Sequence, residues 1–159
     1  MLGAKAPQLA VRWQDQVVEP LEIARDWNGD AFRPDSVNWD AAAQIELGSE
    51  NTIVVEVRSD VAPSTARLKL FKDVDPETGI PADAAVVDLE CPEPNSSCDL
   101  EQTSDGYRVA FHVPQSADID GTFATVSFRW KWIPQFEDGE TTSAVDNVWS
   151  VASGLRLRK

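Results

Sequence analysis

Two short segments carry side-chain oxygens at alternate positions, which is the spacing of the first ligands in a calcium-binding loop. The residues concerned are Asp26, Asn28 and Asp30 in one segment and Asp73, Asp75 and Glu77 in the other. Neither segment continues as an EF-hand loop, because both lack the glycine at the sixth position and the glutamate at the twelfth. We therefore expect calcium at either segment only if distant loops add ligands. Turn formation by Asp and Asn explains both segments without an ion, and the sequence indicates no other cofactor.

The only two cysteines, Cys91 and Cys98, flank a segment rich in proline, asparagine and serine. Strand-like runs lie on both sides, so the thiols can meet at the base of a hairpin loop and form a disulfide. Closing a loop of this length stabilises by about 2.5 kcal/mol in the chain-entropy model. A metal site is the competing interpretation, but two thiolates and one histidine fall short of four ligands. The favoured disulfide indicates an extracellular, periplasmic or cell-surface location.

Histidine-dependent catalysis has a single candidate residue, His112. It shares the expected solvent-facing side of its strand with Arg108, and no G-x-S-x-G nucleophile motif accompanies it. The sequence has no glycine-rich phosphate loop. A pair of carboxylates can hydrolyse glycosides, but with 27 acidic residues the sequence nominates no particular pair. We therefore expect that the chain is not an enzyme.

The segment 26–42 lacks strand periodicity and is long for a connection inside a compact domain. It contains three aromatic residues among several aspartates, a composition that suits a sugar-binding or protein-binding loop if the rings are exposed. The candidate binding residues are Trp27, Phe32, Trp39, Asp26, Asn28 and Asp30. The alternative is that the rings fold under and close one end of the domain, because large aromatic side chains are usually buried.

In the segments that must position these residues, apolar and polar side chains alternate with a period of two almost everywhere. Apolar and polar residues alternate most clearly in residues 53–58, 66–71, 107–113, 126–132 and 149–158. Weaker strand candidates are residues 8–13, 17–23, 44–47, 85–91 and 98–102. Such alternation is typical of strands with one face in the core and one in water, and only one helical turn is expected, near residues 38–44. About eight to ten strands separated by turn clusters predict a single all-β domain over residues 1–159, an antiparallel β-sandwich.

Residues 118–123, Asp-Ile-Asp-Gly-Thr-Phe, precede a long strand, and residues 147–159 form the last one. This layout resembles an immunoglobulin-like or fibronectin-type-III-like module, in which a similar corner leads into strand F. The resemblance implies a sandwich fold and no particular function, because this fold hosts many unrelated functions.

The charge of the chain limits its partners. Its 27 acidic and 14 basic side chains give a formal net charge of −13. The resulting field repels phosphate backbones and anionic lipids, so nucleic acid is a poor candidate, and no apolar run is long enough for membrane insertion. The first residues also lack the charged and apolar regions of a signal peptide.

Together these features predict a non-catalytic β-sandwich module of an exported or cell-surface protein that acts in protein–protein or structural contacts. The alternative is a carbohydrate-binding module that uses segment 26–42, with or without calcium.

Overall fold

The computed structural model describes residues 5–92, 98–132 and 147–159. Within these residues the chain forms twelve strands and one short 3₁₀ helix, η1 (Trp39–Ala41). The first strands are β1 (Leu9–Trp13), β2 (Gln16–Val18), β3 (Leu21–Trp27), β4 (Asp30–Phe32), β5 (Gln44–Glu46) and β6 (Thr52–Val57). The later ones are β7 (Thr65–Phe71), β8 (Val87–Cys91), β9 (Cys98–Gln102), β10 (Tyr107–His112), β11 (Thr122–Trp132) and β12 (Asn147–Arg158). Three strands of only three residues each, β2, β4 and β5, take the number above the eight to ten expected.

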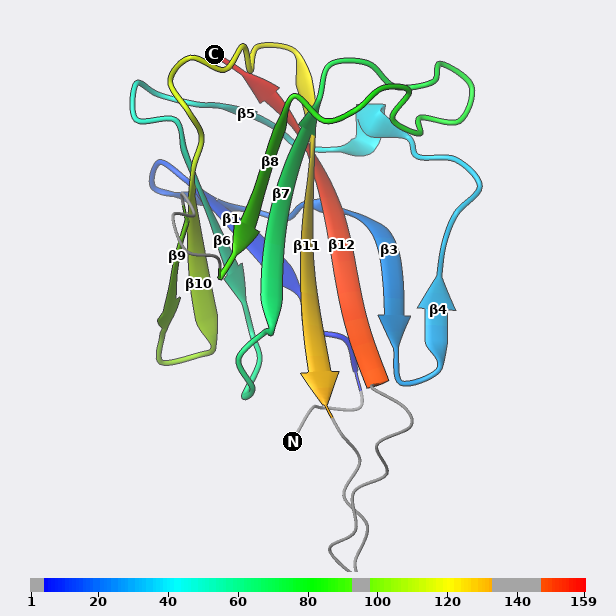
Figure 1. Cartoon of the computed structure of the whole chain (residues 1–159), viewed down its shortest axis with the longest axis vertical. Helices are drawn as coiled ribbons and strands as arrows, with labels where there is room; N and C mark the ends of the chain where they lie inside the picture. Colours follow the sequence, from blue (N-terminus) through cyan, green and yellow to red (C-terminus); the bar gives the residue numbers. More distant parts are fainter. Residues whose placement is uncertain (1–4, 93–97, 133–146) are drawn as a thin grey trace, which may run out of the picture.

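The strands form two sheets that lie face to face, so the expected all-β sandwich is confirmed (Figure 1). The five-stranded sheet has the order β2-β1-β6-β10-β9. The seven-stranded sheet has the order β4-β3-β12-β11-β7-β8, and β5 pairs with β12 outside this path. Every pairing between the described strands is antiparallel except that of β5 with β12.

The strand β12 changes its partner along its length. On one side it pairs with β11 from end to end. On the other side its residues 150–154 pair with β3, with a register shift between Ala152 and Ser153, and its residues 156–158 pair with β5. The pairing with β3 continues for two residues past this bulge and ends at Gly154, which leaves the last part of β12 for a different strand.

The core lies between the two sheets and follows the alternation of the sequence. Buried and less buried residues alternate through β6, β7 and residues 122–131 of β11, so the inward-facing residues predicted there are confirmed. The predicted inward side chain of Trp132 lies outside the described side chains. Large side chains with an exposed fraction of 1% or less include Phe111, Phe128, Trp130, Leu68 and Leu155. Complete burial of such a side chain stabilises by about 1.5–3 kcal/mol, so these residues hold the sheets together.

The expectation of one strand over residues 17–23 is wrong. Val18 ends β2 in the five-stranded sheet, whereas Leu21 begins β3 in the seven-stranded sheet. Glu19 and Pro20 carry the chain from one sheet to the other. The proline explains the break, because it has no N–H group to donate to a strand ladder.

The expectation that segment 26–42 is one long connection is also wrong. The strand β3 continues to Trp27, and β4 returns antiparallel to it with Trp27 paired to Asp30. Asn28 and Gly29 form the two-residue turn, with φ angles of 49° and 82°. Positive φ at both positions is what a type I′ hairpin turn requires, and Asn-Gly is the dipeptide that adopts it most readily. The expected helical turn near residues 38–44 corresponds to η1.

Candidate functional site

Trp27, the first of the predicted binding rings, lies in the core with 2% of its surface exposed. Its ring meets Trp130 of β11 edge-on, with 5.2 Å between the centroids, and the ring of Trp149 of β12 at 4.9 Å. The three rings come from adjacent strands of one sheet and pack on one another. A ring in this position contributes its apolar area to folding and presents no open face to a ligand.

Trp39, the second predicted ring, is also buried, with 6% of its surface exposed. Its Nε1–H donates a hydrogen bond of 2.8 Å to the carbonyl oxygen of Gly79. The ring packs at 5.2 Å from Phe123 and lies directly over Gly154, so η1 covers the outer face of the seven-stranded sheet. The ring therefore closes a sheet face, rather than an end of the sandwich as the alternative interpretation expected.

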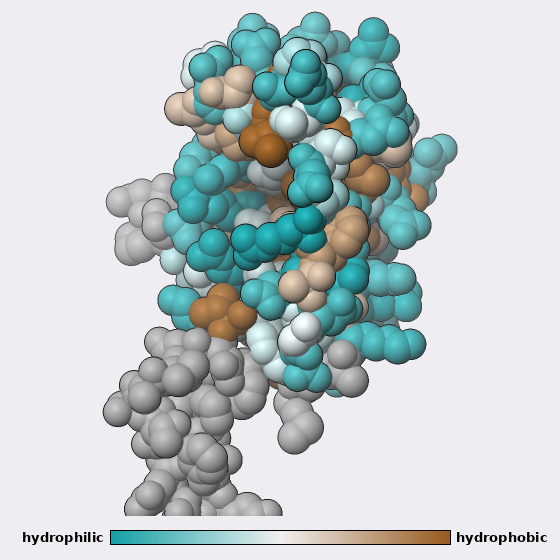
Figure 2. All heavy atoms as spheres, turned by 90° about the vertical axis from the view of Figure 1, so that its right-hand side faces the viewer, coloured by the Kyte–Doolittle hydropathy of each residue, from teal (hydrophilic) through white to brown (hydrophobic). Residues whose placement is uncertain are grey.

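Phe32 is the one predicted ring that reaches solvent, with 36% of its surface exposed. The guanidinium carbon of Arg25 lies 5.5 Å from the centroid of this ring, within cation–π range. Arg25 also forms ion pairs with Glu22 at 2.5 Å and Asp30 at 3.2 Å, and all three line a hollow of about 450 Å³ that Lys5 also borders. The side of the molecule that carries β3 and β4 is largely hydrophilic, with apolar residues in small separate areas (Figure 2).

In each of the two calcium-spaced segments, one carboxylate bonds within the protein. Asp30 pairs with Arg25, as described above. Asp75 Oδ1 accepts hydrogen bonds from the backbone N–H of Glu77 at 2.8 Å and of Thr78 at 3.0 Å. These bonds lower the pKa of Asp75, and the bond from Thr78 has the larger effect. In residues 5–92, 98–132 and 147–159, no group of three or more His, Cys, Asp or Glu side chains is arranged to hold a metal ion.

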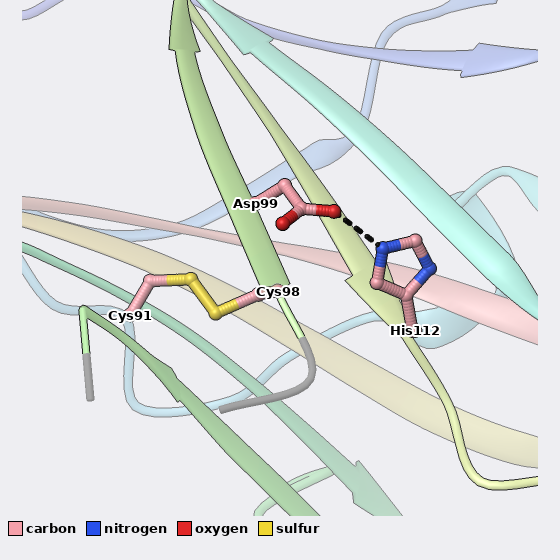
Figure 3. Close-up of a disulfide and its surroundings, with 4 residues drawn as sticks. All are labelled: Cys91, Cys98, Asp99 and His112. Atoms are coloured by element: carbon pink, nitrogen blue, oxygen red, sulfur yellow. Dashed lines mark hydrogen bonds and ion pairs between the residues drawn. A yellow bond between two sulfur atoms is a disulfide. The ribbon is translucent and has the colours of Figure 1, made fainter. Parts of the chain in front are cut away.

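His112 lies on the outer face of the five-stranded sheet, between residues of two neighbouring strands (Figure 3). Its Nε2 is 2.8 Å from Asp99 Oδ2, and its Nδ1 is 3.3 Å from Thr52 Oγ1. An ionised carboxylate only accepts, so the hydrogen of the neutral ring lies on Nε2 and Nδ1 faces the hydroxyl. The order carboxylate, imidazole, hydroxyl is that of a nucleophilic triad. However, the side chains of His112 and Asp99 are 47% and 81% exposed, so water screens their interaction.

The expected disulfide between Cys91 and Cys98 is confirmed, and their Cα atoms are 6.1 Å apart (Figure 3). The expectation that it closes a hairpin is wrong, because β8 and β9 are edge strands of different sheets. The bond therefore fastens the two sheets together at one side of the sandwich. Cys91 is buried, with 2% exposed, and packs into the core.

Sequence reasoning missed a ladder of ion pairs across the outer face of the five-stranded sheet. Arg12 of β1 and Arg108 of β10 both donate to the same oxygen of Glu56 in β6, and Arg108 also reaches Glu101 in β9. Burial tends to raise the pKa of Glu56, but the hydrogen bonds from Arg108 and Arg12 outweigh it and lower that pKa. The same face is hollowed at a pocket of about 580 Å³ lined by Arg12, Arg108 and Arg58. The sequence placed Glu56 and Arg108 on polar strand faces but did not give the register that brings them together.

No helix in the described part of the chain is long and apolar enough to span a bilayer. Comparison of the chain with protein-family models, with curated proteins and with solved structures finds no match.

Proposed function

We propose that the chain is a non-catalytic β-sandwich module of an exported or cell-surface protein, and that it acts through contacts with other proteins. The observation that carries this proposal is the disulfide between Cys91 and Cys98, which joins the edges of the two sheets. Such bonds form and persist in oxidising compartments and are rare in the cytosol.

The strand order supports an immunoglobulin-like arrangement. In one sheet β1, β6, β10 and β9 follow the order A, B, E, D, and in the other β12, β11, β7 and β8 follow G, F, C, C′. The elements β2 to η1 and β5 are then an insertion between strands A and B. Because this fold hosts many functions, the arrangement supports a module and does not by itself identify a partner.

A contact role is favoured over catalysis by the environment of His112. The side chains that could act with it, Asp99 and Thr52, lie on an open sheet face, and the ring itself is 47% exposed. Acyl transfer needs donors fixed in a dry site to stabilise the developing oxyanion, whereas on this face water competes for every charge. We propose that the module functions without a cofactor.

The burial of Trp27 and Trp39 also bears on the sugar-binding alternative. That alternative needs exposed rings on segment 26–42, and of the three only Phe32 reaches solvent. Protein contacts need no aromatic platform, because hydrogen bonds and charge pairs over a broad sheet face supply specificity. The outer face of the five-stranded sheet and the part of the seven-stranded sheet that η1 leaves open therefore support protein partners better than carbohydrate.

The experiment that tests this proposal locates the protein and its thiols together. Cells that produce the protein naturally are treated with a membrane-impermeant amine-reactive label, and the chain is then isolated under alkylating conditions for intact-mass measurement. We expect a labelled chain with both cysteines protected from alkylation. An unlabelled chain with two alkylated cysteines would show that the protein resides in a reducing compartment and would refute the proposal.

A further inference from the structure

The outer face of the seven-stranded sheet carries a basic strip on an otherwise acidic protein. Buried residues of β7 and β11 alternate with outward-facing ones, which places four cations on one face. The basic strip consists of Arg67, Lys69, Arg129 and Lys131. The neighbouring strand β8 adds two acids, Asp88 opposite Lys69 and Glu90 opposite Arg67. On β7, β8 and β11 the four positive and two negative outward-facing charges sum to +2, in a chain with a net charge of −13. Beyond Ser150 of β12, Asp26 of β3 lies on the same face.

The register of the strands sets the spacing of these cations. Ser127 of β11 lies opposite Arg67, and Arg129 lies opposite Thr65. Arg67 and Arg129 are therefore diagonal neighbours, with Cα atoms about 7–8 Å apart. On its other side Arg129 faces Ser150 of β12. The residues beside Arg129, namely Thr65, Ser127 and Ser150, have small hydroxyl-bearing side chains, so a partner can approach this arginine closely.

Not all of these cations form an ion pair with a described carboxylate. Arg67 forms two hydrogen bonds with Asp88, at 2.7 and 2.6 Å, and they lower the pKa of Asp88. Arg129 and Lys131, by contrast, make no ion pair with any residue that the structure describes. Both are exposed. Within the described residues, neither of these two charges is neutralised by an ion pair.

We propose that the basic strip docks an acidic segment of a partner protein, with carboxylates that pair with Arg129 and the neighbouring lysines. This inference rests on the proposed function, because it names the surface and the partner chemistry of a module that acts through protein contacts. Arginine favours carboxylates because its planar guanidinium donates two parallel hydrogen bonds to them.

The distribution of charge favours a short acidic segment over a long polyanion. At physiological ionic strength charges are screened beyond about 8 Å, so a short segment senses the strip and little of the remaining surface. A sulfated polysaccharide or nucleic acid extends beyond the strip and meets the carboxylates that give the rest of the chain its negative charge. A second copy of the chain brings its own charge of −13 and is repelled in the same way.

The test uses a fluorescein-labelled hexa-glutamate peptide and the oxidised protein, with binding followed by fluorescence anisotropy. We expect saturable binding with a Kd between about 10 μM and 1 mM at low salt, weakened by added salt. Arg129→Glu should weaken binding by about tenfold or more, and Arg129→Lys should weaken it less, because lysine keeps the charge but not the two parallel hydrogen bonds. Arg58→Glu is the matched control, because it makes the same charge change at an exposed residue on the other side of the sandwich.

Amide chemical-shift mapping supplies the location, and the expected shifts are confined to residues 65–69 and 125–131. Absence of saturable binding, or equal losses in Arg129→Glu and Arg58→Glu, would overturn the proposal. Tighter binding of a heparin hexasaccharide than of hexa-glutamate, lost in Arg129→Glu, would assign the strip to a polysaccharide and also overturn it. A chain that is exported and oxidised but fails these assays leaves the proposed function standing. A chain with free thiols in a reducing compartment fails the proposed function whatever it binds.

Discussion

Trp39 packs so closely on Gly154 that a Cβ atom at residue 154 would lie 2.7 Å from ring carbon Cζ3. Real Cβ atoms do not approach other atoms this closely, so only glycine leaves room for the ring. The contact fixes η1 to the outer face of β12, far from Trp39 in the sequence.

Gly154→Ala should therefore destabilise the protein, because the added methyl group displaces the Trp39 ring. We expect a loss of about 1–3 kcal/mol in the free energy of unfolding, measured by urea denaturation. Gly48→Ala is the matched control, since a Cβ there meets no atom within 4 Å. Equal stability of Gly154→Ala and the wild type would show that the ring does not occupy this position in solution.

Trp27→Ala should be far more costly than Phe32→Ala, although both residues belong to the same hairpin. Trp27 packs against two other rings in the core, so its removal should cost about 3–5 kcal/mol. Phe32 is 36% exposed, and its removal should cost no more than about 1 kcal/mol. Urea denaturation gives both values, and acrylamide should quench Trp27 only weakly when single-tryptophan variants are compared. The opposite order of stabilities would restore Trp27 as a binding residue.

The disulfide should be complete in the native protein. Intact-mass measurement before and after reduction is expected to show two protected thiols that become alkylated only after reduction. The double change Cys91→Ala and Cys98→Ala should lower stability by about 2.5 kcal/mol, because the unfolded chain gains the freedom of the opened loop. Free thiols in the unreduced, purified protein would contradict the pairing.

Acid should destabilise the protein partly through Glu56. The pKa of Glu56 is lowered in the folded state. Its contribution to the free energy of unfolding is therefore fully present above the pKa of a Glu side chain in the unfolded chain, about 4.3. The contribution is lost as the pH falls through the lower folded-state pKa. We expect Glu56→Gln to cost about 1 kcal/mol at pH 7, as partly exposed ion pairs do, and to show a shallower loss of stability below about pH 5.

The matched control for this measurement is Glu50→Gln, an exposed change with the same loss of charge. Urea denaturation between about pH 7 and pH 3 gives the slopes. The lowered pKa values of Asp75, Asp88 and Asp118 predict that some acid sensitivity persists in the Glu56→Gln protein. Identical slopes for Glu56→Gln and the wild type would show that the two arginines do not hold this carboxylate in its charged form.

The alternation of residues was enough to predict which faces of the strands are buried. Phe128 and Trp130 are in the core and Arg129 is exposed, as their spacing requires. The alternation acts locally, since it depends only on the direction of successive side chains along one strand. It therefore defines the core without saying which strands pair.

Features that depend on pairing between residues far apart in the sequence could not be predicted from the sequence. The ion pairs of Glu56 need the register of three strands, and the contact of Trp39 with Gly154 needs the path of a loop across a sheet. The Asn28-Gly29 turn could have been predicted, because the Asn-Gly dipeptide is a local hairpin signal. The same segment was interpreted as a possible calcium loop instead. Pro20 was likewise a local signal, marking where the chain passes between sheets.

The pairing of β12 with three other strands has a consequence for the order of folding during synthesis. The strands β3 and β5 are synthesised early, but β12, which pairs with both, is synthesised after every other described strand. Until then Asp26 cannot pair with Ser150, and Gln44 cannot pair with Arg156. Contacts this distant in sequence form slowly, because much chain entropy is lost before they stabilise the fold. The seven-stranded sheet should thus remain incomplete until residues 147–158 have been made. Until then β3 and β5 lack the neighbour that holds them in this sheet.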